Sequence, residues 1–326
     1  QIAISPDRAT ETHREAQRSF TPFDPIRQIE ARPAAHQAMV RIMYGCDKFC
    51  SYCIVPSVRG PEQSRSAADI EQEVQRLADE ARRLEVCLEV TLLGQTVNSY
   101  RHRDGGRTWR LADLLVRLHD IEGLARLKFV TNFPRHMTQD LLEAVRDLPK
   151  ASPYLHVPAQ SGSDAVLRRM KRGYTAGAYR DMLERIRRTV PNAAVTSDFI
   201  VGFCGETDDD FERTVELVRD ARFKNSYIFK YSTRPGTRSA EQFEDDVPEA
   251  VKRRRNNALL AVQNAISEED NQAFVGRTVE ILVEGPSKTS VKREQQGETI
   301  QLVGRTACDR IVVVDGPRRW TGRLVH

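Results

Sequence analysis

Residues 45–53 read GCDKFCSYC and place Cys46, Cys50 and Cys53 at spacings of four and three residues. The apolar run Met39–Tyr44 before them is typical of a β-strand, so we expect the cysteines on the loop at the carboxyl end of that strand. A loop can wrap three thiolates around one inorganic cluster, which a straight helix or strand does poorly. A [4Fe–4S] cluster held by three cysteines leaves one iron without a protein ligand, and that iron is open to a substrate or cofactor.

Two alternatives to such a cluster stay open for these cysteines. A structural zinc site built on Cys50 and Cys53 usually has a second cysteine pair or a cysteine–histidine pair, and the sequence has neither at zinc-finger spacing. The second alternative is three unrelated buried thiols, although three of the chain's six cysteines lie in this one short stretch. Spacing alone favours the open-iron cluster over zinc, and zinc over chance.

The spacing, with Tyr52 directly before the last cysteine, is similar to the cluster motif of the radical S-adenosylmethionine (SAM) enzymes. The continuation IVPSVRG at residues 54–60 resembles the methylthiotransferases, and most closely the MiaB-type tRNA enzymes. The resemblance implies that Cys46, Cys50 and Cys53 are the catalytic ligands of a [4Fe–4S] cluster whose open iron binds the amino and carboxylate groups of SAM. Electron transfer from the cluster would cleave SAM to a 5′-deoxyadenosyl radical.

The composition is that of a soluble protein. The chain has 326 residues, of which 29% are charged, and its mean hydropathy is −0.52. No apolar run approaches the roughly 20 residues of a transmembrane helix, and no signal-peptide pattern is present. Thiols that hold a cluster require a reducing compartment, so we expect a cytoplasmic protein without a membrane partner. The formal net charge of +4 is too small to indicate a nucleic-acid partner by itself.

Strand-like and helix-like runs alternate from Ala38 to about Tyr231. The predicted strands are Met39–Tyr44, Leu88–Leu93, Leu127–Thr131, Tyr154–Val157, Ala194–Val201 and Ser226–Tyr231, and the predicted helices are Ala67–Leu84, Leu111–Leu118, Thr138–Asp147, Tyr179–Val190 and Asp208–Asp220. This α/β alternation predicts a parallel sheet covered by helices. With the resemblance it implies a partial (β/α)6 radical SAM barrel over residues 38–271, whose site lies at the carboxyl ends of the strands.

Residues 1–37 show no hydrophobic period and contain four prolines, which predicts an extended linker. Methylthiotransferases normally carry an N-terminal domain with three further cysteines and a second [4Fe–4S] cluster. The resemblance therefore implies that residues 1–37 link to a domain missing from this chain. The second cluster is expected only in a full-length protein, and the chain alone should be an incomplete catalyst.

Residues 272–326 form a separate pattern, after a long predicted helix at 248–271. The short predicted strands Thr278–Glu284, Thr299–Gly304 and Arg310–Val314, with turns at Gly285-Pro286 and Gly316-Pro317, indicate a small antiparallel β-barrel. Nine basic minus six acidic residues give this segment +3 of the chain's +4. It resembles the TRAM domain, the RNA-binding module of this family. We expect its removal to weaken tRNA binding and to leave SAM cleavage nearly unchanged.

Polar and small residues follow several predicted strands. The resemblance implies a SAM pocket made by residues at these positions, namely Tyr52, Gly94, Gln95, Gln160, Ser161 and Asp198. Gln95 and the run VNSY at 97–100 match the MiaB-type sequence where related methylthiotransferases differ. Cys204 stands where the family has proline, and we interpret it as an inert core thiol.

Basic residues give candidate RNA contacts in three places. Lys171 and Arg172 follow the fourth strand, Arg253 and Arg254 belong to the basic run at 252–255, and Arg318 and Arg319 lie in the C-terminal segment. Clustered cations of this kind bind phosphates, although most charge runs are simply solvated.

The predicted function is methylthiolation of tRNA at C2 of an isopentenyl-modified adenosine beside the anticodon. That carbon has no leaving group and a strong C–H bond, so a radical is needed. The expected partners are the tRNA and an electron donor such as a flavodoxin-type reductant. One alternative is a methylthiotransferase for threonylcarbamoyl-adenosine or a ribosomal-protein aspartate. Another is a non-catalytic, zinc-stabilised RNA-binding module.

Overall fold

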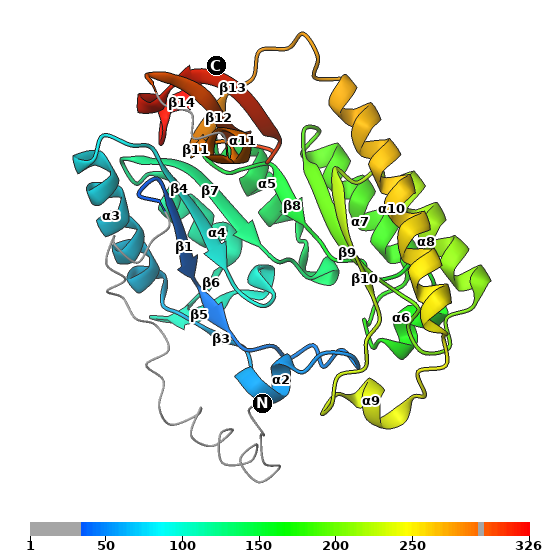
Figure 1. Cartoon of the computed structure of the whole chain (residues 1–326). Coiled ribbons are helices and arrows are strands. Elements are labelled where there is room, and N and C mark those ends of the chain that lie inside the picture. The colour runs from blue at the N-terminus through cyan, green and yellow to red at the C-terminus, as the bar shows by residue number, and fades with distance from the viewer. Residues whose placement is uncertain (1–33, 293–296) are drawn as a thin grey trace.

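A computed structural model describes residues 34–292 and 297–326 and has six parallel strands at its centre (Figure 1). They form two sheets of three strands, β1-β4-β7 and β10-β9-β8. Their bounds are β1 (Gln37–Arg41), β4 (Leu88–Leu93), β7 (Leu124–Val130), β8 (Tyr154–His156), β9 (Ala194–Val201) and β10 (Asn225–Lys230). The backbone amide of Ser152 donates to Leu127 at 2.8 Å, and that of Asn132 donates to His156 at 3.0 Å, which joins β7 to β8. The predicted partial (β/α)6 barrel is confirmed, and it is open between β1 and β10.

Helices cover the outer face of this barrel. They are α3 (Ala67–Arg83), α4 (Leu111–His119), α5 (Gln139–Asp147), α7 (Ala176–Thr189), α8 (Asp208–Ala221) and the long α10 (Glu249–Gln272). Val40 and Val90 of the strands are fully buried in one core with Ile70 and Val74 of α3. Burying such a side chain contributes about 1.5–3 kcal/mol, so the alternate apolar positions of each strand fix which face meets the helices.

Several short elements were missed by sequence reasoning. They are β2 (Met43–Tyr44), α2 (Val55–Arg59), β3 (Gln63–Ser64), the hairpin β5 (Arg101–Asp104) and β6 (Arg107–Arg110), α6 (Asp164–Arg169), α9 (Arg238–Gln242), α11 (Lys288–Lys292), β14 (Leu324–Val325) and the 3-10 turns η2 (Val97–Ser99), η3 (Pro134–His136) and η4 (Arg318–Trp320). Most are too short or too polar to show a hydrophobic period. The hairpin is indicated in the sequence by the pair Gly105-Gly106, which is typical of a two-residue β-turn. Both glycines have the positive φ that such a turn requires.

The C-terminal segment forms a curled antiparallel half-barrel in the order β13-β12-β11-β14. It contains β11 (Ile281–Pro286), β12 (Thr299–Thr306) and β13 (Ile311–Pro317). The pairs Gly285-Pro286 and Gly316-Pro317, predicted as turns between strands, are instead the last two residues of β11 and β13. Gly285 follows a bulge in β11, and a Cβ on Gly316 would stand 2.5 Å from the Trp320 ring that packs on it.

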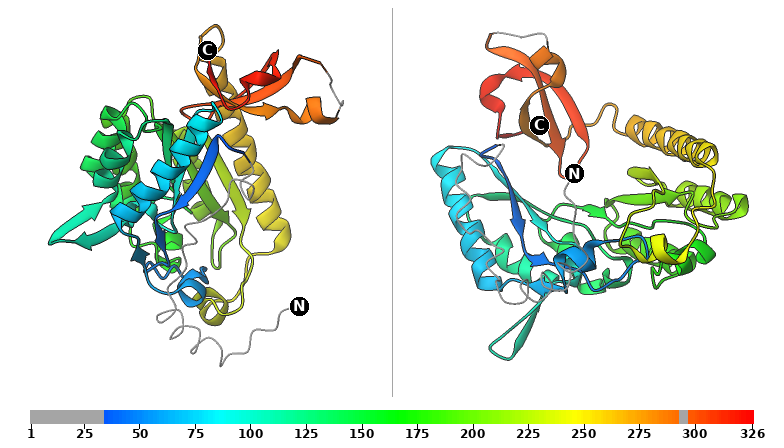
Figure 2. Two further views of the ribbon diagram at one scale, coloured as in Figure 1. Left: turned by 90° about the vertical axis from the view of Figure 1, so that its left-hand side faces the viewer. Right: turned by 60° about the horizontal axis from the view of Figure 1, so that its bottom comes forward.

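This half-barrel covers the amino ends of the barrel strands, opposite α2 and the cysteine loop (Figure 2). The buried Arg126 donates to the carbonyl of Arg305 at 2.7 Å. The buried ammonium of Lys128 lies 2.9 Å from the Glu89 carboxylate and 3.1 Å from that of Asp309. Because these buried barrel ions have partners in the C-terminal segment, the expectation that residues 272–326 can be removed without effect on the barrel does not fit the structure.

The predicted linker at residues 1–37 lies outside the described residues as far as residue 33. His36 is already buried and Gln37 is the first residue of β1, so the ordered barrel begins before the expected boundary. Within residues 34–292 and 297–326, no helix combines the length and apolarity needed to cross a membrane.

Candidate cluster and cofactor site

The cysteine loop runs between β2 and α2, at the carboxyl ends of the barrel strands. Its three cysteines are free thiols and each is partly exposed. The loop is fixed by backbone contacts, with the Cys46 amide donating to Gly60 at 3.1 Å and the Ser51 amide to Met170 at 3.0 Å. Gly45, which opens the loop at φ 74°, admits no side chain, because a Cβ would stand 1.9 Å from the Pro61 carbonyl oxygen.

The chemistry of the three thiols fits an iron–sulfur cluster. Burial raises the pKa of Cys46 to about 11 and also raises that of Cys53, so ligation at neutral pH would release protons. In the described part of the chain, no three cysteine, histidine or carboxylate side chains converge closely enough to hold a single metal ion. A four-iron cluster spreads its ligands over separate irons, so thiols set apart on one loop suit it better than they suit zinc.

Arg172 stands directly against the cysteine loop. Its guanidinium donates to the Cys50 sulfur at 3.2 Å, to the Tyr174 hydroxyl at 2.8 Å and to the Pro158 carbonyl at 3.1 Å. It lies 5.2 Å from the centre of the Phe133 ring and is only 7% exposed. A phosphate of an RNA cannot reach it there, which corrects the predicted RNA contact. A fixed positive charge at this point stabilises the negative charge of thiolate ligands.

Tyr52 and Lys171 flank this arrangement. The Tyr52 hydroxyl accepts from Arg172 at 3.4 Å, and its ring packs on Phe203 with centroids 6.5 Å apart. Through these two contacts, Tyr52 holds the cysteine loop against Arg172 and Phe203. Lys171 is exposed and has a positive φ of 56°, so of the pair Lys171 and Arg172 only the lysine is open to an RNA.

The residues after β4 divide into two kinds. Gly94 admits no side chain, because a Cβ would stand 2.4 Å from Met43 Cγ. The Asn98 amide donates to the Phe133 carbonyl at 2.9 Å and accepts from the Phe133 amide at 2.8 Å, and Ser99 bonds to His136 at 2.7 Å. Asn98 and Ser99 thus tie the loop after β4 to the loop after β7, which the sequence alone did not reveal.

The loop after β8 holds Gln160 in an unusual conformation. Its φ is 73°, its amide donates to the Asp198 carbonyl at 2.8 Å, and its carbonyl accepts from Ile200 at 3.0 Å. Non-glycine residues in this region often mark ligand sites. The predicted neighbour Ser161 differs, since it is buried and its hydroxyl bonds to Thr214 of α8 and accepts from the Ser163 amide. Ser161 fixes the loop and does not face a ligand.

Asp198 lies on the inner face of β9. One of its carboxylate oxygens is 3.4 Å from His156 Nε2, and the other ring nitrogen of that histidine is 2.9 Å from the Thr196 hydroxyl. Asp198 and the backbone of Gln160 are thus brought together across two neighbouring strands, at the same end of the barrel as the cysteine loop.

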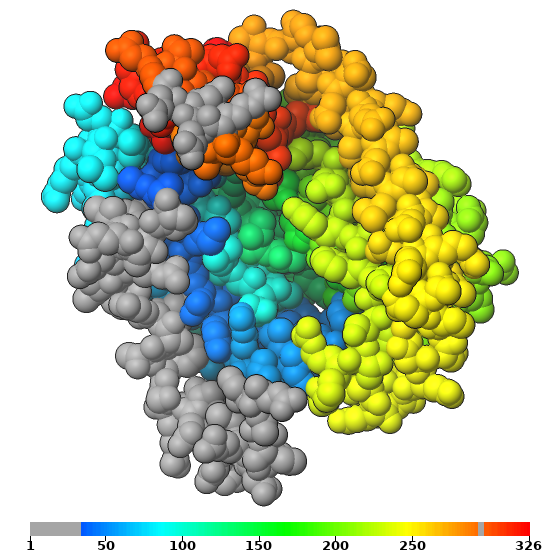
Figure 3. Space-filling view, in the orientation of Figure 1, coloured from blue at the N-terminus to red at the C-terminus, as the bar shows by residue number. Residues whose placement is uncertain are grey.

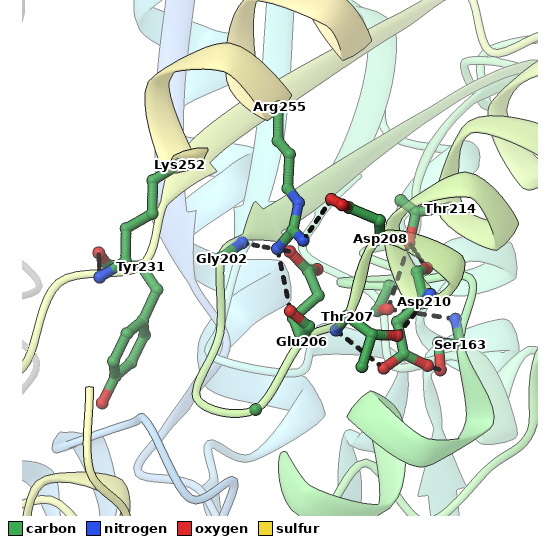
Figure 4. Close-up of polar contacts among 12 residues, drawn as sticks. Ser163, Gly202, Glu206, Thr207, Asp208, Asp210, Thr214, Tyr231, Lys252 and Arg255 are labelled. Carbon is green, nitrogen blue, oxygen red and sulfur yellow. Dashed lines mark hydrogen bonds and ion pairs between the residues drawn. The ribbon is translucent and has the colours of Figure 1, made fainter. Parts of the chain in front are cut away.

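A buried ionic group supports the loop after β9 (Figure 4). The Glu206 carboxylate accepts from the Gly202 amide at 2.5 Å and pairs with Arg255 at 2.8 Å, and Arg255 also pairs with Asp208 at 2.8 Å. Burial raises the pKa of Glu206 to about 7, against the opposing effect of the Gly202 amide and Arg255. Lys252 pairs with Asp245 at 2.5 Å.

The basic run at 252–255 therefore faces two ways. Lys252 and Arg255 are buried against this loop, and only Arg253 and Arg254 are exposed. Lys252 and Arg255 are three residues apart, and the buried Leu259 follows four residues later. This helical spacing indicates that the three side chains share one face of α10, and it was not used in the sequence analysis. Arg318 and Arg319, in η4, are exposed on the C-terminal half-barrel. Cys204 is buried, as predicted.

Residues 40–218 match the profile of the family described as the Radical SAM superfamily. The whole chain is 58% identical over 325 residues to a tRNA-2-methylthio-N(6)-dimethylallyladenosine synthase of Rhodopirellula baltica and covers 67% of that protein. The chain belongs to the radical SAM superfamily. Within it, the chain belongs to the family of these synthases, with 42% identity over 295 residues to the protein of Clostridium botulinum and 44% over 290 residues to that of Desulforamulus reducens.

This radical SAM chain spans only part of those relatives, because it covers 62% of the Clostridium protein and 60% of the Desulforamulus protein. Among solved structures, the radical SAM enzyme coproporphyrinogen III oxidase (HemN) of Escherichia coli is similar with a TM-score of 0.51 and 17% identity, over 76% of this chain and 55% of that one. This likeness shows the fold alone. Membership of the radical SAM superfamily implies a [4Fe–4S] cluster and SAM as cofactors.

Proposed function

We propose that the protein is a tRNA methylthiotransferase that adds a methylthio group to C2 of a dimethylallyl-modified adenosine beside the anticodon. The observation that carries the proposal is the cysteine loop, with three free thiols at the carboxyl ends of the barrel strands and Arg172 donating to Cys50. The names of relatives 42–58% identical to the chain supply the substrate. They favour neither threonylcarbamoyl-adenosine nor a ribosomal-protein aspartate.

In this proposal the chain's own residues hold and orient the cofactors. Cys46, Cys50 and Cys53 would hold the cluster, which supplies the electron that splits SAM. Arg172 compensates negative charge at Cys50. Gln95, whose side chain bonds to no other described residue, offers both a donor and an acceptor to the polar groups of SAM. Asp198 is placed to accept from hydroxyl groups such as those of a ribose.

Tyr52, Gly94, Gln160 and Ser161 complete the proposed SAM site in different ways. Gln160 has a backbone bent by its positive φ, and Tyr52 holds the cysteine loop in place through its packing on Phe203. Gly94 and Ser161 act through packing, because neither has a free side-chain group to offer. The side chains around the site would have to keep other C–H bonds away from a carbon radical, since such a radical abstracts hydrogen from C–H bonds within its reach.

The remaining parts of the proposal concern domains and partners. Residues 36–271 would form the radical SAM domain and 272–326 a TRAM-like domain, with exposed Lys171, Arg253, Arg254, Arg318 and Arg319 as phosphate contacts. A second [4Fe–4S] cluster for sulfur insertion would belong to another domain of a full-length protein. A flavodoxin-type protein would donate electrons, and the reducing cytoplasm suits both clusters.

The test is anaerobic reconstitution with iron and sulfide. We expect about four irons per chain and broad absorption at roughly 400 nm, which a zinc protein lacks. Cys46→Ala, Cys50→Ala and Cys53→Ala should each abolish the iron, and the matched controls Cys87→Ala, Cys204→Ala and Cys308→Ala should retain it. With SAM and a reductant, the loaded protein should form 5′-deoxyadenosine. Equal loss of iron in the control variants would refute the ligand assignment, and a colourless zinc protein would refute the chemistry.

A further inference from the structure

Three large apolar side chains are exposed on the two strands that border the opening of the barrel. Met39 of β1 is 65% exposed, and Tyr227 and Phe229 of β10 are 48% and 54% exposed. Single exposed apolar residues are ordinary on a protein surface. These three differ because they lie on the strands at the two sides of one hollow, which Figure 3 shows between the blue and the yellow-green segments.

Contacts of the neighbouring residues show that Tyr227 and Phe229 point into the barrel. Side chains of a strand alternate between its faces. Ser226 bonds to Gln263 of α10 at 2.7 Å, so the outer face of β10 carries residues 226 and 228. The Tyr227 ring, on the opposite face, packs against His156 with centroids 6.1 Å apart. Phe229 shares that inner face.

The same reasoning places Met39 on the inner face of β1. Its neighbours Ala38 and Val40 are buried in the core beneath the helices. Gln37, two residues earlier, donates to Glu89 at 3.2 Å, and Glu89 pairs with Lys128 inside the barrel. Met39 therefore points the same way as Gln37, into the barrel.

We call Tyr227 and Phe229 the apolar wall, which Met39 faces from β1 at the other side of the opening. This wall adjoins the candidate cofactor residues. In the parallel register of β9 and β10, Tyr227 is opposite Asp198 and Phe229 is opposite Ile200. His156, which touches Tyr227, is the residue 3.4 Å from the Asp198 carboxylate. An occupant of the wall would thus lie beside the SAM site and would enter through the opening between β1 and β10.

We infer that the apolar wall is the subsite for the dimethylallyl group of the target adenosine. The inference rests on the proposed function and adds the residues that recognise the substrate. A branched five-carbon alkenyl group has no hydrogen-bonding atom, so only apolar contact can recognise it. Other inward-facing residues of the barrel strands around the wall are polar, namely Glu89 and Lys128 toward the amino ends of the strands and His156 and Asp198 next to Tyr227. Burial of the prenyl group on the wall positions C2 of the same base toward the cofactors.

The test compares two anticodon stem-loop RNAs, one with dimethylallyladenosine and one with adenosine, in binding to the complete chain. We expect the wild type to bind the prenylated RNA more tightly. Phe229→Ala and Tyr227→Ala should lower this ratio of affinities by at least about tenfold, the effect of one or two lost methylenes in an apolar pocket. Phe229→Leu should keep most of the ratio. Val116→Ala, at a 52% exposed residue on the outer helix α4, is the matched control and should keep all of it.

Each other outcome overturns the inference in a recognisable way. Equal loss of affinity for both RNAs would make the wall a general RNA contact. Loss of SAM cleavage without RNA in Phe229→Ala would assign the wall to the SAM pocket. An unchanged ratio in a folded Phe229→Ala variant would leave the wall to another occupant, such as a preceding protein domain. The wild type could prefer the prenylated RNA, and the full-length protein could form methylthiolated tRNA, while Phe229→Ala leaves the ratio of affinities unchanged. In that case the proposed function stands and only this inference fails.

Discussion

At the scale of single residues, Glu206 shows how burial and pairing compete. Its carboxylate is buried against Arg255 and the Gly202 amide, and its pKa in the folded protein is raised to about 7 from the ordinary value of 4.5. A raised carboxyl pKa means that the folded state binds the proton more tightly than the unfolded chain does. The contribution to stability is therefore complete below about pH 4.5 and is lost as the pH rises through about 7.

Glu206→Gln should remove this pH dependence. The amide keeps an oxygen for the Gly202 amide and cannot ionise. Relative to the variant, the wild type should lose roughly 2 kcal/mol of unfolding free energy between about pH 5.5 and 8. Urea unfolding of both proteins at several pH values measures this difference. Parallel stability curves would show that Arg255 keeps the Glu206 carboxylate ionised throughout the range.

At the scale of elements, the packing of α10 on the loop after β9 depends on a glycine. Gly202 has φ 69°, and a Cβ there would stand 2.4 Å from Lys252 Cγ. Lys252 itself is held by Asp245 at 2.5 Å and donates to the Tyr231 carbonyl at 3.3 Å. The buried lysine side chain cannot move away without breaking its ion pair with Asp245.

Gly202→Ala should therefore destabilise the protein by about 2–4 kcal/mol, from the strained φ and the displaced lysine together. The matched control is Gly177→Ala in the first turn of α7, where the nearest atom to the new Cβ is 3.8 Å away. This control should be neutral or stabilising by up to about 1 kcal/mol, because alanine suits a helix better than glycine. Thermal unfolding of the two variants gives the comparison. Equal effects would mean that α10 adapts freely to the loop.

The elements also show what a sequence can predict. The long alternating runs gave six strands and the covering helices, because burial of one face imposes a period that can be counted. The hairpin β5–β6 has few apolar residues, and its bounds depend on the Gly105-Gly106 turn. The cysteine loop was predicted from spacing. The Arg172–Cys50 contact was not, because it joins residues 122 positions apart through the fold. Ser161 was assigned to SAM by resemblance, although packing on α8 uses its hydroxyl.

At the scale of the whole molecule, charge joins the half-barrel to the barrel. The Lys128 ammonium lies between Glu89 of the barrel and Asp309 of the half-barrel, and Arg126 pairs with Glu280 at 3.2 Å. Loss of one partner leaves a buried charge uncompensated, which is strongly destabilising. Removal of residues 272–326 would affect several such groups at once, so a truncated protein reports on folding as well as on RNA binding.

Charge reversal on the surface separates the two effects. Arg318 and Arg319 are exposed on η4. If they contact phosphates, the double variant Arg318→Glu and Arg319→Glu should bind tRNA more weakly at low salt. Its plot of log Kd against log salt should be shallower by about 0.7–0.9 for each phosphate that is no longer neutralised, because fewer counterions are released. Its thermal stability should stay within about 0.5 kcal/mol of the wild type, as is usual for surface substitutions.

The matched control reverses Arg83 and Arg188, which are exposed on the outer helices α3 and α7. Both double variants change the net charge by the same amount, so a general electrostatic effect would weaken tRNA binding equally in the two. A specific role for the half-barrel requires the larger loss of affinity and the shallower slope in the Arg318/Arg319 variant alone. Measurement of tRNA Kd at two or more salt concentrations decides between these results. An unchanged slope at Arg318 and Arg319 would leave the half-barrel as a structural cover for the amino ends of the barrel strands.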